Sequence, residues 1–256
     1  PGQSGDVMAD PTETVCLWVA AHVRLSGITQ DPTVAHLAKV LNELGVRLVA
    51  ARVIPDIEDV IVNTVNECRA KFDYIFTTGG IGPTHDDITA VCMAKAFGVE
   101  VIRHPEIEAV IRRREASAEV MESRLLMARV PEGSKLIDNP TGGPQGFQID
   151  NVFVMAGVPS VMQAMASTFS DKQIKGAKPV RSRSVGAYLG ESAVAGALED
   201  IQNQHPEVDL GSYPFYREKG YGTNLVMRGT DEAELEVVKS KVGEMIKSFG
   251  AEPFDP

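Results

Sequence analysis

The stretch of this chain with the clearest capacity for chemistry runs from Phe76 to Thr89 and reads FTTGGIGPTHDDIT. It places three glycines and two adjacent aspartates, Asp86 and Asp87, between an apolar run and an amphipathic segment. Glycines let backbone N–H groups approach a phosphate closely, and carboxylates can hold Mg²⁺ beside that phosphate. We therefore predict a binding loop for a phosphorylated small molecule, with Mg²⁺ or another divalent cation as cofactor.

The residues of this loop receive separate predicted roles. The predicted ligand-binding residues are Thr78, Gly79, Gly80, Gly82 and Thr84. Asp87 is the predicted catalytic and metal-binding carboxylate, with Asp86 as a second metal candidate, because adjacent residues on a helix point about a hundred degrees apart. The alternative is structural: a tight turn in which Thr84 caps the next helix and Asp87 completes a capping box. The spacing matches neither a P-loop nor GxGxxG.

Short apolar runs alternate with amphipathic segments on both sides of the loop. The predicted strands are Val15–Ala20, Val46–Pro55, Asp73–Gly80 and Val152–Pro159, and the predicted helices are Pro32–Gly45, Ile57–Phe72, Thr84–Phe97 and Pro159–Phe169. This alternation predicts an α/β fold, a three-layer α/β/α sandwich with a mostly parallel sheet. Ligands of such sheets bind beyond the carboxyl ends of the strands, which is where the glycine loop falls.

Two other segments are expected at the same edge of the sheet. In VIPDIED, Asp56 follows the second strand, so we predict a catalytic carboxylate there, with the N-cap of the next helix as the alternative. In MAGVPS, Gly157 ends the last strand and Pro159 begins a helix, which predicts a second ligand-facing turn or a plain connection. His85 is predicted to be a surface residue.

The order of elements changes after a polar segment, Ser170–Pro179, which we predict to be a linker. Beyond it, the pattern is strand, helix, strand, strand, helix, which predicts a small α+β (βαββα) module. The predicted domains are therefore 12–172 and 179–250. Residues 1–11 are predicted to be a disordered leader.

The composition limits the classes of partner. A formal net charge of −10 and a pI near 5.0 argue against nucleic acid or an anionic membrane as partner. The sequence contains no run of eighteen apolar residues. The three cysteines, Cys16, Cys68 and Cys92, are far apart and form no CxxC pair, which predicts reduced thiols and a cytoplasmic protein.

At residues 79–89 the string GGxGPTxDDxT resembles the molybdopterin-binding domain superfamily of molybdenum-cofactor biosynthesis proteins. With VIPD upstream and MAGVPS downstream, the chain is most similar to the amino-terminal domain of the competence/damage-inducible protein A family. The resemblance implies a three-layer fold, homo-oligomers (dimers or trimers), and molybdopterin or a nucleotide as ligand. It also assigns Asp56 and Asp87 to the acidic site, Gly157 and Pro159 to a second loop, and Ser26 and Gly27 to a further ligand-binding segment.

One segment departs from the family pattern. After the first strand, the family has a glycine followed by two polar or acidic residues, where this chain has Ala21, His22 and Val23. Three functions therefore remain open: a molybdopterin- or nucleotide-binding protein, a metal-dependent ADP-ribose or dinucleotide pyrophosphatase, and a non-catalytic binding or scaffold protein. Loss of a carboxylate near the ligand would weaken a metal site, which favours binding over turnover.

Overall fold

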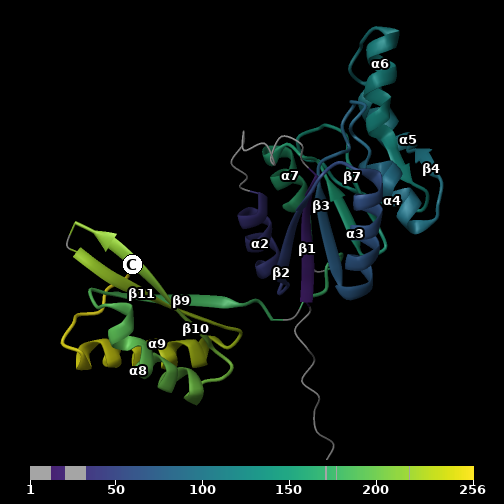
Figure 1. The fold of residues 1–256 in the computed structure, drawn as a ribbon. Coiled ribbons are helices and arrows are strands. Elements are labelled where there is room, and N and C mark those ends of the chain that lie inside the picture. The colour runs from purple at the N-terminus through teal and green to yellow at the C-terminus, as the bar shows by residue number, and fades with distance from the viewer. Residues whose placement is uncertain (1–12, 21–32, 171, 177, 219) are drawn as a thin grey trace, which may run out of the picture. The chain divides into compact units, whose positions relative to one another are not determined.

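The computed structural model describes residues 13–20, 33–170, 172–176, 178–218 and 220–256 (Figure 1). The chain divides into two compact units, and the boundary between them in the sequence falls between Ala177 and Lys178. We call them unit 1 and unit 2 and describe each by itself.

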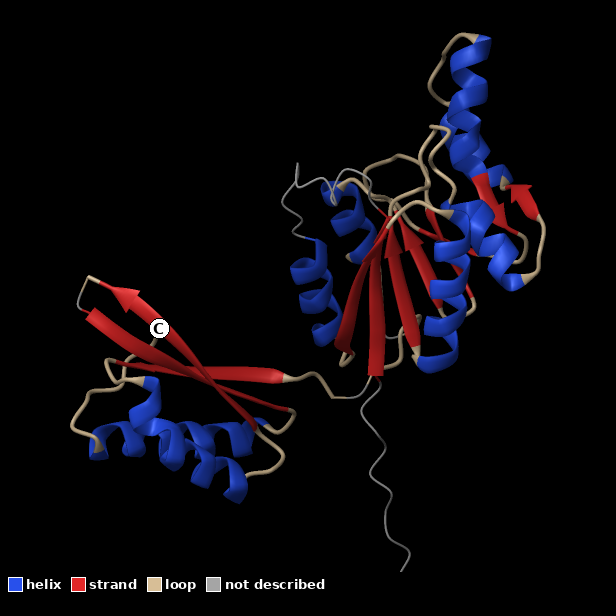
Figure 2. Ribbon diagram, in the orientation of Figure 1, coloured by secondary structure: helices blue, strands red, loops and turns tan. Residues whose placement is uncertain are grey.

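A six-stranded sheet, with strand order β2-β1-β3-β8-β7-β6, forms the centre of unit 1 (Figure 2). Its strands are β1 (Glu13–Ala20), β2 (Arg47–Ile54), β3 (Tyr74–Thr78), β6 (Lys135–Ile137), β7 (Gly146–Ile149) and β8 (Val152–Met155). The pairs β2-β1, β1-β3 and β3-β8 are parallel, whereas β8-β7 and β7-β6 are antiparallel. The sheet is therefore mixed, and the prediction of a mostly parallel sheet is wrong for β6 and β7. A two-residue turn at Asp150 and Asn151 joins β7 to β8, and so short a connection permits only antiparallel pairing.

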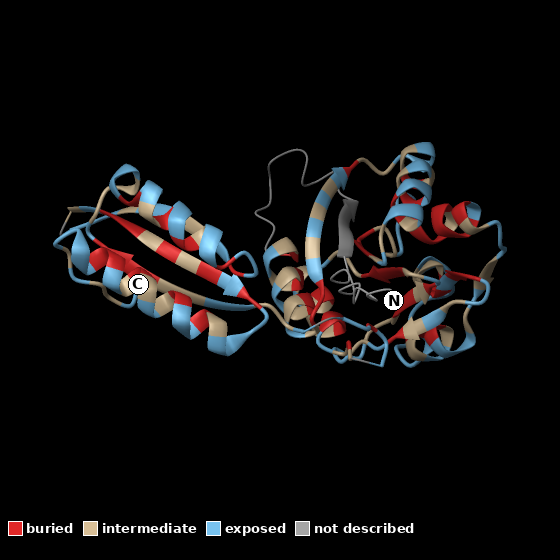
Figure 3. Cartoon of the chain, turned by 90° about the horizontal axis from the view of Figure 1, so that it is seen from below, coloured by how far each residue is buried: buried red, intermediate tan, exposed pale blue. Residues whose placement is uncertain are grey.

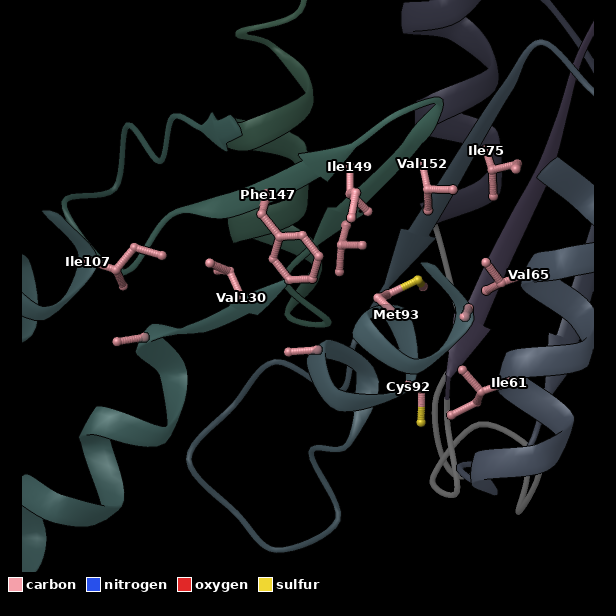
Figure 4. Packing of buried hydrophobic residues seen from close by; sticks show 14 of the residues in the cluster. Ile61, Val65, Ile75, Cys92, Met93, Ile107, Val130, Phe147, Ile149 and Val152 are labelled. Carbon is pink, nitrogen blue, oxygen red and sulfur yellow. The ribbon is translucent and has the colours of Figure 1, made fainter. Parts of the chain in front are cut away.

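Helices cover both faces of this sheet. On one face lie α2 (Thr33–Glu43) and α7 (Pro159–Ala166), and on the other lie α3 (Glu58–Lys71) and α4 (Thr89–Phe97). In α2 the fully buried apolar side chains are Leu37 and Leu41, one helical turn apart, and they pack with Phe76 and Phe153 of the sheet. On the opposite face, Ile61 and Val65 of α3 and Met93 of α4 pack against Ile75 and Val152 (Figure 4). The two clusters fill the spaces between the sheet and the helices on each face, which makes unit 1 a three-layer α/β/α sandwich.

A smaller assembly extends unit 1 between α4 and β6. It contains β4 (Val101–Arg103), α5 (Pro105–Arg112), α6 (Ala118–Leu125), the 3₁₀ turn η1 (Leu126–Ala128) and β5 (Arg129–Pro131). Strands β4 and β5 pair antiparallel, and buried Ile107, Leu125 and Val130 join the cluster shared with α3 and α4. This assembly carries several arginines on its helices and on β5.

Unit 2 is a three-stranded antiparallel sheet, with order β10-β11-β9, and two helices. Its elements are β9 (Arg181–Ala187), α8 (Glu191–Gln204), β10 (Asp209–Arg217), β11 (Gly220–Gly229) and α9 (Glu232–Ser248). Along β11, buried positions alternate with more exposed ones, so one face of the sheet packs against both helices (Figure 3). The predicted βαββα order is confirmed.

Two further observations concern the helices. None of the helices in the described residues is long and apolar enough to cross a membrane. Cys68 and Cys92, on α3 and α4, are buried free thiols, as predicted.

Candidate functional site

The glycine loop leaves the carboxyl end of β3 and is anchored to the next strand of the sheet. The Gly79 N–H donates to the carbonyl of Met155 at the end of β8, at 3.0 Å. A Cβ at Gly157 would lie 3.0 Å from the Gly79 Cα, so the turns after β3 and β8 touch backbone to backbone. The structure thus brings together two segments that are far apart in the sequence. Glycine is required at position 157 because a side chain there would collide with the backbone of Gly79.

Thr89 holds the first half of the loop in a conformation that requires glycine. Its Oγ1 donates to the Gly79 carbonyl and its N–H donates to the Gly80 carbonyl, both at 3.0 Å. Gly79 and Gly80 have φ angles of 97° and 68°, in the left-handed region. A Cβ at Gly80 would lie 2.0 Å from the Thr89 Oγ1, so both the φ angle and the packing against Thr89 exclude a side chain at this position.

Asp87 closes the second half of the loop. Its Oδ2 accepts hydrogen bonds from the Thr84 N–H at 2.9 Å and from the Thr84 hydroxyl at 2.5 Å. The carboxylate lies over Gly82, where a Cβ would come within 2.5 Å of Oδ2. Both hydrogen bonds use Oδ2, and no described residue bonds to Oδ1, which can therefore serve a ligand or a cation.

The predicted start of the following helix is wrong. Helix α4 begins at Thr89, with Ile88 as an N-cap that makes no side-chain hydrogen bond. Thr84 and Asp87 are instead bonded to each other across a separate turn, in which the Asp87 N–H donates to the Thr84 carbonyl at 3.2 Å, and both aspartates precede the helix. The physical reason is that Thr89 bonds back to Gly79 and Gly80, which fixes the chain before the helix begins.

A cavity of about 130 Å³ lies beside the loop. Gly80, Gly82, His85 and Asp87 line it on the loop side, and Arg129 at the start of β5 lines it from the smaller assembly. His85 is exposed, as expected, but it faces this cavity. Arg129 was not predicted, because a single arginine on a three-residue strand, far along the chain from Asp87, has no recognisable spacing.

Asp56 is half-buried directly after β2, near the N-terminus of α3. It is not the N-cap, since α3 begins at Glu58 with Ile57 as a cap that makes no side-chain bond. Burial, with smaller contributions from the carboxylates of Glu58 and Asp56, raises the pKa of the Cys92 thiol to about 12. Asp56 therefore lies close enough to α4 to act on its electrostatics.

The predicted metal ligands do not form a preassembled cluster. Within the part of the chain that the structure describes, no three His, Cys, Asp or Glu side chains are arranged to hold a metal ion. Magnesium commonly uses one or two carboxylates and completes its shell with water and substrate phosphate. The Oδ1 of Asp87 fits such a partial site.

The remaining predicted residues occupy different places. Thr78 is 1 % exposed, which puts it beneath the loop rather than on its surface. Pro159 is the first residue of α7, where its fixed φ suits a helix start. Ser26 and Gly27 lie outside the described residues, as do Ala21, His22 and Val23.

Comparison with known families decides the relationship of unit 1. A family described as a probable molybdopterin binding domain matches residues 13–176. The chain belongs to this family. A second family, described as the FAD synthase middle domain, matches residues 179–254.

The match to this chain covers different shares of its relatives' own length. A protein of Archaeoglobus fulgidus is 29% identical over 225 residues, which are 88% of this chain and 91% of that protein. One of Pyrobaculum calidifontis is 32% identical and covers 74% of this chain and 76% of its own length. A CinA-like protein of Geobacter sp. is 28% identical over 89% of this chain, which spans only 56% of that relative.

A solved structure agrees with the fold of unit 1. The crystal structure of the protein CinA, described as of unknown function, from Thermoplasma acidophilum superposes with a TM-score of 0.56 at 24% identity. It covers 64% of this chain and 99% of its own. At this identity the likeness concerns the fold.

Proposed function

We propose that unit 1 binds a phosphorylated small molecule, molybdopterin or a nucleotide, at the loop from Thr78 to Asp87. The observation that carries the proposal is that three consecutive backbone N–H groups have no acceptor in the described part of the chain. Those of Gly80, Ile81 and Gly82 form no hydrogen bond among the described residues, whereas the flanking N–H groups of Gly79 and Thr84 are bonded. Successive unbonded N–H groups in a glycine turn form a concave site for an anion.

The surroundings of the loop support the same ligand class. The N-terminus of α4 lies beside the loop and favours negative charge, and Arg129 adds a guanidinium at the cavity wall. The turn containing Gly157 and Pro159 packs against the start of the loop, where Gly157 approaches the backbone of Gly79, and it does not line the cavity itself. Phosphate would be held by backbone N–H groups and Arg129, and Asp87 Oδ1 would accept a hydrogen bond from the ligand or bind a cation.

A binding measurement with matched variants tests this proposal. Molybdopterin, AMP and ADP-ribose would be titrated into the full chain by calorimetry, with Asp87→Asn and Asp86→Asn compared with the wild type. We expect saturable binding of at least one ligand, weakened about tenfold by Asp87→Asn because a charged hydrogen-bond partner is lost. Asp86→Asn, which leaves the Thr84 contacts intact, should have a smaller effect. Absence of saturable binding to all three ligands would refute the proposal.

A metal-dependent pyrophosphatase is a second candidate function, favoured by the open Oδ1 of Asp87 in a cavity that His85 also lines. In that case Asp87 would hold a divalent cation such as Mg²⁺, which would neutralise charge on the substrate phosphates, and Asp56 would be tested as the second carboxylate. We expect release of AMP from ADP-ribose that requires Mg²⁺ and is abolished by Asp87→Asn. Binding without AMP release would instead support a non-catalytic binding or scaffold protein.

The partners expected from the sequence belong to the same proposal. We propose a homo-oligomer, dimer or trimer, without nucleic-acid or membrane partners. Val49 and Val53, 41% and 52% exposed on the edge strand β2, provide an apolar stripe that a second copy could cover. Sedimentation velocity would test it: the wild type should be dimeric or trimeric, and Val49→Lys with Val53→Lys should shift it toward monomer.

A further inference from the structure

Unit 2 contains a cluster of three ionisable side chains. His205 lies directly after α8, and only 10% of its side-chain surface is exposed. Two residues of α9 lie at its ring nitrogens: the Glu234 carboxylate is 2.5 Å from Nδ1, and the Lys241 Nζ is 2.8 Å from Nε2. Positions 234 and 241 are two helical turns apart, so both side chains leave the same face of α9.

The two neighbours determine where the imidazole carries its hydrogen. A carboxylate only accepts hydrogen bonds and an ammonium only donates them. We therefore assign the hydrogen to Nδ1, which donates to Glu234, and leave Nε2 as the acceptor of the bond from Lys241. This assignment makes His205 a neutral imidazole whose basic nitrogen faces an amine.

The backbone fixes His205 in this position. Its N–H donates to the carbonyls of Ile201 and Gln202, both at 3.1 Å, and its carbonyl accepts from the Val208 N–H at 3.1 Å. Ile201 and Val208 also belong to the buried apolar cluster that α8 and α9 share. Because the base and the amine are held in place before any reaction, little orientational entropy is lost when they act together.

Lys241 has a second acceptor that orients its nitrogen. Nζ also donates to the Gln204 Oε1 at 3.1 Å. An amine that has lost one proton keeps two N–H bonds and gains a lone pair. If the two N–H bonds remain directed at His205 and Gln204, the lone pair occupies the remaining tetrahedral direction, where no described residue bonds to Nζ. Lys241 is partly exposed, which gives a small reagent access to the residue.

This arrangement suits the reaction of an amine with an acyl donor. A neutral amine attacks an activated carbonyl, and the attack is completed only when the nitrogen gives up a proton to a base. An imidazole whose other nitrogen is held by a carboxylate is such a base, because the carboxylate keeps the ring in the correct tautomer and stabilises the imidazolium that forms.

We propose that Lys241 is a site of acylation by acyl thioesters, with His205 as the general base. The ammonium first loses a proton to solvent. The amine then attacks the thioester carbonyl, so that an N–C bond forms, and His205 Nε2 takes the second proton from nitrogen. The C–S bond breaks, and the departing thiolate receives this proton from the imidazolium, which Glu234 stabilises in the meantime. The product amide keeps one N–H, which cannot bond to both His205 and Gln204.

Lys95 is a natural comparison, because its partner is a carboxylate instead of an imidazole. Hydrogen bonding to Glu58 raises the pKa of Lys95, which keeps its amine protonated. A carboxylate is also a much weaker base than an imidazole. Lys95 should therefore react slowly with the same acyl donor.

Timed incubation of the full chain with acetyl-CoA, followed by mass spectrometry of its peptides, tests the proposal. Lys241 should be acetylated at least about tenfold faster than Lys239, which lies on the same helix and has no histidine beside it among the described residues. Lys95 should react more slowly than Lys241 as well. In concentrated guanidinium chloride, which unfolds unit 2, the difference between Lys241 and Lys239 should disappear.

His205→Gln is the variant that isolates the base, because glutamine can still accept a hydrogen bond from Lys241 but does not take up a proton. It should lower the rate at Lys241 to that at Lys239, with circular dichroism as the control for folding. If the variant does not fold, the comparison of the folded and the denatured wild type decides. Equal rates at Lys241 and Lys239 in the folded wild type, an unchanged rate in a folded His205→Gln protein, or a preference that persists in guanidinium chloride would each overturn the inference.

Discussion

Two glycine-containing loops leave the same edge of the unit 1 sheet, and their glycines serve different purposes. In the loop after β3, a Cβ at Gly80 would collide with Thr89 and one at Gly82 would collide with Asp87. In the loop before β7, Gly142 has a φ of 76° but nothing within 4 Å of where a Cβ would be. The first loop has no room for side chains at these glycines because it packs against Thr89 and Asp87. The second loop is held by hydrogen bonds of its own Asn139 side chain, and Gly142 has open space beside it.

The difference predicts the largest effect at Gly80. Gly80→Ala should lower the free energy of unfolding of unit 1 by about 3 kcal/mol, because left-handed strain and overpacking against Thr89 add together. Urea unfolding would be followed through Trp18, the only tryptophan, which lies in β1. A loss no larger than that of Gly142→Ala would show that Thr89 can move aside and that the loop is not closed.

The pH dependence of stability that Cys92 causes reports on how tightly α4 packs behind the first loop. Since burial raises the pKa of its thiol from about 9 to about 12, the unfolded chain loses this proton at lower pH than the folded chain does. Stability should therefore decrease as pH rises above 9, by about 2 kcal/mol between pH 9 and 11. Cys92→Ala should remove this slope, whereas a slope equal to that of the wild type would place its source elsewhere.

Thr89 and Thr141 allow the same chemical change in each loop. Thr89→Val removes a buried hydrogen bond to the Gly79 carbonyl and should cost about 1.5 kcal/mol. Thr141→Val removes an exposed bond to Asn139 and should cost about 0.5 kcal/mol, because water replaces the lost partner. The same urea experiment measures both, and equal costs would contradict the distinction between a packed and an open loop.

Gly142 should give a smaller effect than Gly80. Gly142→Ala should cost about 1 kcal/mol, the penalty of a left-handed φ without any steric contact. A loss of several kcal/mol would mean that the loop is more tightly packed than the structure indicates.

How much the sequence could predict depends on how local the deciding interaction is. The strand before Gly79, the helix containing Cys92 and the glycine loop itself all follow from patterns within some fifteen residues. The start of α4 at Thr89 did not, because it depends on a hydrogen bond from Thr89 back to Gly79. The family relationship, carried by the string at 79–89, was identified correctly.

The second loop shows the limit more clearly. Strands β6 and β7 contain three and four residues, too few for a reliable alternation, and the segment between them is rich in glycine and proline. The pairing of β7 with β8 follows from the two-residue turn between them, but the pairing of β6 with β7 joins strands on either side of a longer loop and follows from no local pattern. The pairing of these two strands was therefore not predicted.

The bond from Gly79 to Met155 also fixes when the binding loop can form during synthesis. Strand β8 and the turn at Gly157 leave the ribosome only after the whole segment from Gly79 to Asn151 has been made, which takes on the order of seconds. Until then the glycines follow a strand, β3, that can pair with β1 but still lacks β8 on its other side. A nascent chain arrested before β8 should consequently carry the complete sequence motif and yet bind nothing.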